Sequence, residues 1–263
     1  AELALFDARI AAAGLRPSRP SECAALLLLA TLAGATADTV VPTARAILDL
    51  SDRDGTAVGF VAALERLGHA DQSVAAAFQA HVTIGSLPLL LFGTDEQKDR
   101  WLRPLAEGRM LGAFGLTEPD AGSDTRGIST RAERKDGGWL INGRKAFISN
   151  AGTDMSFGVT VLARTESTDK GPRFASFVVE KDTPGFTMGP KLPGIGWKGL
   201  DTRDLFFDDV WVPDDHLVGD PALGLGQFLR TLEVGRISIA ALSLSLTQAV
   251  LDLSLAYAAE RKQ

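Results

Sequence analysis

The residue composition and the spacing of apolar residues change twice along the chain, and these two changes limit how its 263 residues can fold. Residues 1–112 are rich in Ala and Leu at helical spacing, with Gly and Pro mostly at plausible helix ends. Residues 113–219 consist of short apolar runs, alternating patterns and frequent Gly, Asp and Pro. Over residues 220–263 the apolar residues again follow helical spacing. The chain is therefore predicted to be an α+β multidomain protein, with helical segments on either side of a β-domain.

Three stretches of the first segment are predicted to be helices. Thr56–Leu67 and Gln72–Leu90 carry the helical pattern, and a disturbance is expected in the second near Pro88. The third begins at Thr94–Gln97, a capping-box pattern in which the hydroxyl and the Gln side chain each satisfy an end amide. This helix is expected to bury Trp101, Leu102 and Leu105 and to end near Gly108.

The middle segment is predicted to be antiparallel sheet. Two runs, Trp139–Ile141 and Arg144–Ile148, flank Asn142-Gly143, a pair that suits a type I′ hairpin turn. Asp136–Gly138 marks the turn before them, and Pro213 is expected to end the last strand because it cannot donate to a ladder. Further strands are expected at Phe157–Ala163, Phe174–Glu180, Phe186–Met188 and Asp204–Phe207.

The last segment, Leu223–Lys262, is predicted to be one long helix, or two pieces that meet around Gly235. Its apolar surface is wider than a lone surface helix would expose, so it is expected to pack on a partner surface or another subunit. The apolar residues are Ile237, Ile239, Leu242, Leu244, Leu246, Val250, Leu251, Leu253 and Leu255.

Charge and composition exclude several classes of function. The net charge is −6 without a block of like charges, which gives no reason to expect nucleic acid binding. A single cysteine, Cys23, allows no internal disulfide and favours a reducing cytoplasm. Residues 1–20 lack the pattern of a signal peptide, and the apolar run Ala24–Ala33 is too short for a membrane span of about 20 residues. No metal site is expected, since the histidines are scattered: His69, His81 and His216.

The stretch Phe114–Asp124 contains the most groups that could bind a ligand. It reads as a strand running into a turn that is dense in Gly, Pro and small hydroxyl residues. Exposed amides and hydroxyls at a strand end can hold a polar ring edge or a phosphate. A surface turn with Asx and Ser caps would use the same residue types, so both interpretations stand at this point.

Several motifs resemble the acyl-CoA dehydrogenase family. Thr117–Asp124 is similar to its flavin-binding signature, Phe92–Leu102 to the helix before it, and Asn142–Asn150 to its second flavin segment. Asp201–Arg203, Phe207–Val210 and Val212-Pro213 follow in the family's order and spacing. The resemblance covers about residues 58–263, whereas residues 14–57 depart from the family pattern.

The resemblance implies an N-terminal helical domain at 1–112, a central antiparallel β-barrel-like domain at 113–219, and the start of a C-terminal four-helix bundle at 220–263. The chain would then stop within that last helical domain, with FAD between the last two domains. The residues implied to bind FAD are Phe114, Leu116, Thr117, Gly122, Ser123, Phe147, Ile148, Ser149 and Arg261. The residues implied to contact the substrate are Ser123, Glu233 and Arg236.

The implied reaction is the α,β-dehydrogenation of an acyl thioester carried by CoA or an acyl-carrier protein. A carboxylate takes the α-proton while the β-hydrogen leaves as hydride to FAD, and an electron-transfer flavoprotein reoxidises the flavin in a homo-oligomeric enzyme. The base is expected beyond residue 263, because Gly235 occupies the alternative base position. A flavin oxidase or monooxygenase of the same fold, or a non-catalytic partner subunit, are the alternative functions.

Overall fold

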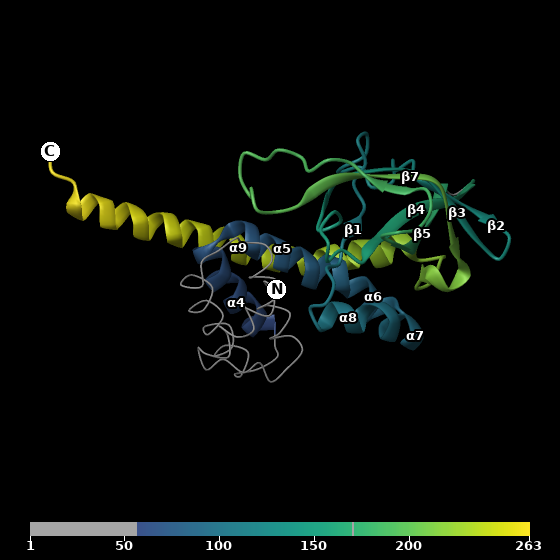
Figure 1. Cartoon of the computed structure of the whole chain (residues 1–263), viewed down its shortest axis with the longest axis horizontal. Coiled ribbons are helices and arrows are strands. Elements are labelled where there is room, and N and C mark those ends of the chain that lie inside the picture. The colour runs from purple at the N-terminus through teal and green to yellow at the C-terminus, as the bar shows by residue number, and fades with distance from the viewer. Residues whose placement is uncertain (1–56, 170) are drawn as a thin grey trace.

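The computed structural model describes residues 57–169 and 171–263, which form a group of helices, a β-sheet and a long C-terminal helix. Figure 1 shows helix α9 (Gly224–Glu260) running from below the sheet, past the N-terminal helices, and projecting beyond them. Cys23 and the apolar run Ala24–Ala33 lie outside the described residues.

The first two predicted helices are present with extended ends. One is α4 (Ala57–Ala70), and the other is a continuous run of α5 (Gln72–Gln79), η1 (Ala80–Ser86) and α6 (Leu87–Phe92). Segment η1 is π-helical and comes before Pro88, which lies in the first turn of α6. A proline ring crowds the carbonyl four residues earlier, so the disturbance lies in the turn before the proline and not at it.

The capping box at Thr94 is confirmed. Thr94 N donates to Gln97 Oε1 at 3.0 Å, and Gln97 N donates to Thr94 Oγ1 at 3.2 Å. Gln97 Nε2 also donates to the carbonyls of Asp215 and Leu217, which joins this helical segment to the sheet. The segment comprises α7 (Asp95–Gln97), η2 (Lys98–Leu102) and α8 (Arg103–Ala106). Trp101 and Leu105 are buried as predicted, and Leu102 is half-buried.

The sheet is open, so the prediction of a barrel-like domain is wrong. Most of its strand pairs are antiparallel as predicted, but two are parallel, so the sheet is mixed. Its strands are β1 (Phe114–Gly115), β2 (Arg131–Lys135), β3 (Gly138–Ser149), β4 (Gly158–Thr168), β5 (Gly171–Glu180), β6 (Phe186–Met188), β7 (Thr202–Pro213) and β8 (Leu217–Val218). They pair in the order β6-β7-β3-β2-β4-β5-β8, with β1 beside β4. Both β1 and β2 run parallel to β4, because neither reaches it through a tight turn that would force an antiparallel direction.

The hairpin predicted at Asn142-Gly143 is also wrong, because both residues lie inside the continuous strand β3. They form an irregularity in the pairing with β7, where the Asn142 amide exchanges two hydrogen bonds with Asp209. Gly143 has φ of +150°, and a Cβ there would lie 2.7 Å from the Thr130 Cα. The glycine therefore serves a close backbone approach, and the tight turn lies at Asp136-Gly137, where both φ values are positive.

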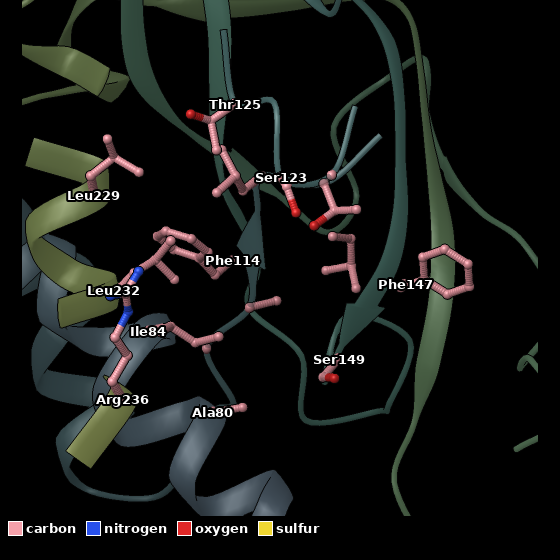
Figure 2. A pocket seen from close by; sticks show the side chains of 16 residues that line it. Ala80, Ile84, Phe114, Ser123, Thr125, Phe147, Ser149, Leu229, Leu232 and Arg236 are labelled. Atoms are coloured by element: carbon pink, nitrogen blue, oxygen red, sulfur yellow. The ribbon is translucent and has the colours of Figure 1, made fainter. Parts of the chain in front are cut away.

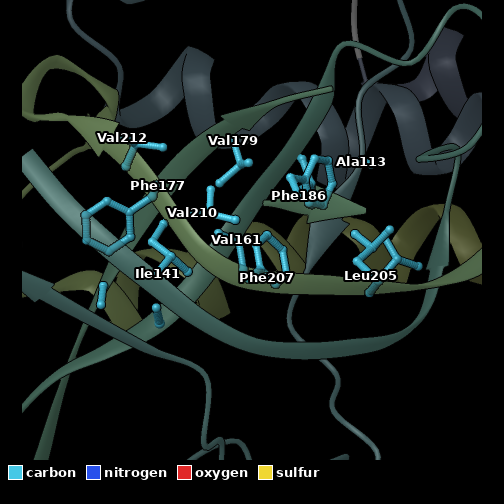
Figure 3. Packing of buried hydrophobic residues seen from close by; sticks show 14 of the residues in the cluster. Ala113, Ile141, Val161, Phe177, Val179, Phe186, Leu205, Phe207, Val210 and Val212 are labelled. Atoms are coloured by element: carbon cyan, nitrogen blue, oxygen red, sulfur yellow. The ribbon is translucent and has the colours of Figure 1, made fainter. Parts of the chain in front are cut away.

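Strands β5, β6 and β7 contain three of the other predicted strands, and β4 contains the fourth except for its first residue, Phe157; β7 ends at Pro213 as predicted. Their inward side chains, together with Ile141 of β3, form an apolar core on one face of the sheet (Figure 3). Burying such a side chain contributes roughly 1.5–3 kcal/mol each. Its larger members are Ile141, Val161, Phe177, Val179, Phe186, Leu205, Phe207, Val210 and Val212.

Helix α9 is a single helix that continues through Gly235. In its first part Phe228, Ala241 and Leu242 are buried, whereas residues 251–260 are exposed throughout. The described residues thus supply only part of the partner surface predicted for its apolar side, namely the part that covers Leu242.

Two described helical stretches, Gln72–Phe92 and Gly224–Glu260, are long and apolar enough to cross a membrane by length and composition. The first is largely buried inside the protein, as is usual for the core helix of a soluble protein. Length and apolarity alone therefore do not distinguish a span from a packed helix here.

Candidate functional site

A cavity of about 550 Å³ lies between the sheet and the helices (Figure 2). It is lined by Ala80, Ile84, Gly112, Ala113, Phe114, Leu116, Thr117, Gly122, Ser123, Thr125, Phe147, Ile148, Ser149, Leu229, Leu232 and Arg236. The volume lies within the usual range of small-molecule sites, roughly 300–1,000 Å³.

One wall of the cavity is the segment that follows β1. Glu118 and Ala121 exchange backbone hydrogen bonds of 2.9 and 3.2 Å, which closes the turn at Pro119 and Asp120. A Cβ at Gly122 would meet nothing within 4 Å, so this glycine leaves bare backbone at the cavity. The strand-and-turn pattern seen in the sequence thus forms a wall whose polar groups are backbone amides and small hydroxyls.

Four side-chain hydroxyls at the cavity have no hydrogen-bond partner among the described residues: those of Thr117, Ser123, Thr125 and Ser149. The Thr117 amide likewise has no acceptor in the described part of the chain. Ser123 is exposed and the other three residues are half-buried, so these hydroxyls face the open cavity and not the core. The cavity therefore presents donors and acceptors that a polar ligand could satisfy.

The end of β3 forms a second wall. Phe147 has φ of +59° and a side chain that is 68% exposed, while Ile148 beside it is buried. A positive φ is unusual for a bulky residue and indicates a backbone held by its surroundings, here with an aromatic face left uncovered. Phe147 also borders a second cavity of about 490 Å³, formed with the loop that includes Lys191 and Trp197.

Helices close the cavity on the other side. Ala80 and Ile84 come from η1, and Leu229, Leu232 and Arg236 come from α9. Phe114 of β1 stacks on Phe228 of α9, with ring centroids 3.8 Å apart, which fixes the helix against the strand. Figure 2 shows Arg236 reaching towards the cavity from α9. It makes no ion pair within the described residues.

A buried ion pair lies behind the first two walls. Lys145 Nζ donates to Glu118 Oε1 at 2.8 Å, and both side chains are almost completely buried. Burial raises the pKa of the Glu118 carboxyl, but the Lys145 charge and several hydrogen bonds outweigh it, so the pKa lies below its usual range. Burial lowers the pKa of Lys145, and Glu118 opposes that shift.

His81 of η1 is buried near the cavity. Its Nδ1 accepts a hydrogen bond of 3.0 Å from Gly112 N, which requires an unprotonated nitrogen. Burial lowers the pKa of His81 to about 4, although a backbone hydrogen bond with Leu105 opposes the shift.

Eight of the nine residues implied to bind FAD line this one cavity, although they come from two separate stretches of the sequence. The ninth, Arg261, does not line it; Arg261 caps the C-terminal end of α9, the end that projects beyond the other helices in Figure 1. Of the substrate residues, Ser123 and Arg236 line the cavity, whereas Glu233 is exposed and does not.

The cavity lining contains no carboxylate among the described residues, and these residues hold no metal-binding group of three or more His, Cys, Asp or Glu. Gly235 is buried in α9, and a Cβ there would lie 3.5 Å or more from its neighbours Ile84, Thr83 and Gln79.

Sequence reasoning missed the helical wall, namely Ala80, Ile84, Leu229 and Leu232, and also Gly112, Ala113 and Thr125. The helical residues belong to ordinary apolar helical patterns, so nothing in the sequence distinguishes them from core residues.

Comparison with known proteins identifies the family. Residues 52–109 match the acyl-CoA dehydrogenase N-terminal domain, and residues 113–210 match the middle domain. The probable acyl-CoA dehydrogenase YngJ of Bacillus subtilis is 44% identical over 80% of this chain and 55% of its own length.

Solved structures agree. Butyryl-CoA dehydrogenase from Megasphaera elsdenii is similar with a TM-score of 0.76 at 38% identity, over 81% of this chain and 55% of that one. An acyl-CoA dehydrogenase from Bacillus anthracis, complexed with FAD, is similar with a TM-score of 0.73 at 33% identity. The match covers 79% of this chain and 35% of that one. The chain belongs to the acyl-CoA dehydrogenase family, as its motifs predicted, and spans about half the length of the curated relatives it matches.

Proposed function

We propose that this chain forms the FAD and thioester site of an enzyme that dehydrogenates acyl thioesters at the α,β position. The observation that carries the proposal is the single cavity into which eight predicted flavin residues converge. They come from Phe114–Ser123 and from Phe147–Ser149, which are far apart in the sequence.

The residues at the cavity fit a flavin. Apolar side chains such as Leu116 and Ile148 suit the faces of a flat ring, and Phe147 adds an aromatic surface. The free Thr117 amide and hydroxyl suit the polar edge of the ring. Arg261 would reach the FAD diphosphate of a neighbouring subunit in a homo-oligomer, which its place outside the lining of this cavity accommodates.

Bound FAD supplies the two-electron acceptor for the hydrogen that leaves the β-carbon. The chain's own residues bind and orient the thioester. Ser123 lies where it could contact the pantetheine arm, and Arg236, without an ionic partner in the described chain, suits the phosphates of CoA or of a carrier-protein arm. Glu233 is the weaker substrate residue, because it lies outside the cavity lining.

Removal of the α-proton requires a base, and no described carboxylate lines the cavity. We place the base outside the described residues, in the complete helical bundle that α9 begins. An electron-transfer flavoprotein is the proposed acceptor, and the bacterial relatives together with the single cysteine support a cytoplasmic location.

The test is an absorbance spectrum of the purified protein with its complete helical bundle, before and after FAD, followed by anaerobic addition of butyryl-CoA. Uptake of FAD with flavin bands, and bleaching by the thioester, are expected. Flavin that binds but reacts rapidly with oxygen after reduction would favour the oxidase or monooxygenase alternative. Bound flavin that no thioester bleaches would favour a non-catalytic subunit.

A variant pair makes this test specific to the cavity. Thr117→Val removes one free hydroxyl at nearly constant volume and is expected to weaken FAD binding by roughly tenfold. Thr187→Val, on the exposed side of β6, is the matched control and should bind FAD like the unmodified chain. Equal FAD affinity of both variants would show that the cofactor does not use this wall.

A further inference from the structure

The ion pair of Glu118 and Lys145 connects the two walls of the cavity from behind. The two side chains are 2% and 0% exposed and do not line the cavity, although Thr117 and Phe147 close to them do. Glu118 follows the strand β1, and Lys145 belongs to β3. The pair thus links segments that are 27 positions apart.

The Glu118 carboxylate is held on both oxygens. Oε1 accepts a hydrogen bond from Thr130 N at 2.9 Å in addition to Lys145, and Oε2 accepts from Ser129 N at 2.6 Å and from its Oγ at 2.7 Å. A buried ion pair usually gains little stability over an apolar pair of the same size, because both ions lose their hydration. Stability alone therefore does not account for this arrangement.

The second hydrogen bond of Lys145 goes to the backbone of the cavity wall. Nζ donates to Leu116 O at 3.0 Å, and this carbonyl belongs to the same peptide group as the free Thr117 amide. A cation on the carbonyl polarises the peptide group and makes its N–H a stronger donor. On the other side, Ala146 N donates to Thr117 O at 2.8 Å, so both peptide groups of Thr117 are bound to β3.

Regular strand pairing does not extend along this wall. Strand β1 covers only Phe114–Gly115, and the chain from Leu116 to Ser123 has no ladder beyond the bridge of Glu118 with Ala121. The bonds from Lys145 and Ala146 are therefore what fixes Thr117.

We propose that Lys145, held by Glu118, is a positioning residue for the cofactor: it fixes the Leu116–Thr117 peptide and strengthens the Thr117 amide as a donor to an acceptor atom on the flavin ring. This inference rests on the proposed FAD function and assigns the pair no contact with substrate or flavin.

One arm of the test needs no cofactor. Amide hydrogen exchange is measured without FAD for the Glu118, Ala121 and Ala146 amides in the unmodified chain, in Lys145→Met and in Lys181→Met. Lys181 is the matched control, since its Nζ also donates to a backbone carbonyl, that of Thr153, away from the cavity. Lys145→Met is expected to speed exchange at these amides by about tenfold or more, whereas Lys181→Met is expected to leave their exchange unchanged. Unchanged exchange in Lys145→Met would overturn the positioning role.

The second arm measures the cofactor. The double variant Glu118→Gln/Lys145→Met leaves no unpaired buried charge, and its melting temperature without FAD is measured first. Its FAD dissociation constant is expected to rise about tenfold and the flavin midpoint potential to become more negative, because a weaker donor stabilises the electron-rich reduced ring less. A variant that melts like the unmodified chain and binds FAD with the same affinity and potential would make the pair purely structural and overturn the inference.

The two proposals fail differently. If the unmodified chain takes up no FAD, the proposed function fails, while the exchange arm still decides whether Lys145 positions the wall. If the unmodified chain binds FAD and the variants behave like it in both arms, the proposed function stands and the inference about Lys145 fails.

Discussion

Two glycines and a histidine set the distance between the helical wall and the strand wall of the cavity. A Cβ on Gly85 would lie 2.6 Å from the Gly112 carbonyl carbon, and a Cβ on Gly112 would lie 2.8 Å from that of Gly85. Backbone thus meets backbone, and any side chain at either position would push η1 away from β1. The hydrogen bond from Gly112 N to His81 then fixes the contact.

His81 is expected to make the protein less stable in mild acid. Its folded pKa of about 4 lies below the ordinary value of 6.5, so between these pH values the unfolded chain binds a proton that the folded chain does not. Stability is therefore lost as the pH falls from 6.5 to 4, by up to about 3 kcal/mol. Urea unfolding at several pH values should show this slope, and His81→Gln, which cannot protonate, should flatten it. Equal slopes in both proteins would contradict the assignment.

At the scale of the element, α9 combines two roles along its length. Its first part supplies Leu229, Leu232 and Arg236 to the cavity and packs Phe228 against Phe114. Next to the cavity, Gln79 Nε2 donates to Ser238 Oγ of α9 at 2.8 Å and also to Thr83 Oγ1. This buried polar contact fixes the register of α9 against the helical run α5–η1.

Gly235 lowers the stability of α9. Glycine in a helix interior costs roughly 0.5–1 kcal/mol relative to alanine, and a Cβ at Gly235 would make only ordinary contacts, the closest at 3.5 Å to Ile84. Gly235→Ala is thus expected to raise the free energy of unfolding by about that amount, as measured by urea denaturation. Gly85→Ala is the contrasting control, because its Cβ would meet backbone, and it should destabilise the protein. A destabilising Gly235→Ala would show that α9 is packed more tightly here than these contacts indicate.

At the scale of the whole molecule, the packed half and the projecting half of α9 differ sharply. The projecting half leaves large apolar side chains uncovered by the described residues (Figure 1). Leu251, Leu253, Leu255 and Tyr257 are 49, 72, 62 and 64% exposed. A patch of this kind is typical of a surface that another domain or subunit covers.

The chain alone is therefore expected to associate through α9. Sedimentation velocity should show a mass above the monomer that rises with concentration in the micromolar range. Leu251→Lys/Leu255→Lys places charges on one face of the helix, since the two positions are one turn apart, and should shift the protein to monomer. Ser254→Lys, an exposed polar position nearby, is the control that should leave association unchanged. A monomer at all concentrations would contradict this expectation.

The sequence by itself determined the features that depend on a few neighbouring residues. The capping box at Thr94, the end of β7 at Pro213 and the long helix α9 all formed where they were predicted. Each depends on local backbone preferences or on a periodicity that the sequence displays directly. The family motifs also indicated both strand-side stretches of the cavity, Phe114–Ser123 and Phe147–Ser149.

Only the tertiary structure decided which surfaces meet. Asn142-Gly143 has the composition of a turn, but its pairing with β7 kept it within a strand, because ladder hydrogen bonds and burial outweigh a local turn preference. The parallel neighbours of β4 and the helical wall at Ile84 and Leu229 likewise depend on contacts between distant parts of the chain. The Glu118–Lys145 pair also depends on the tertiary structure, because the fold excludes water from both charges. A carboxylate and an ammonium interact strongly only when solvent no longer screens them.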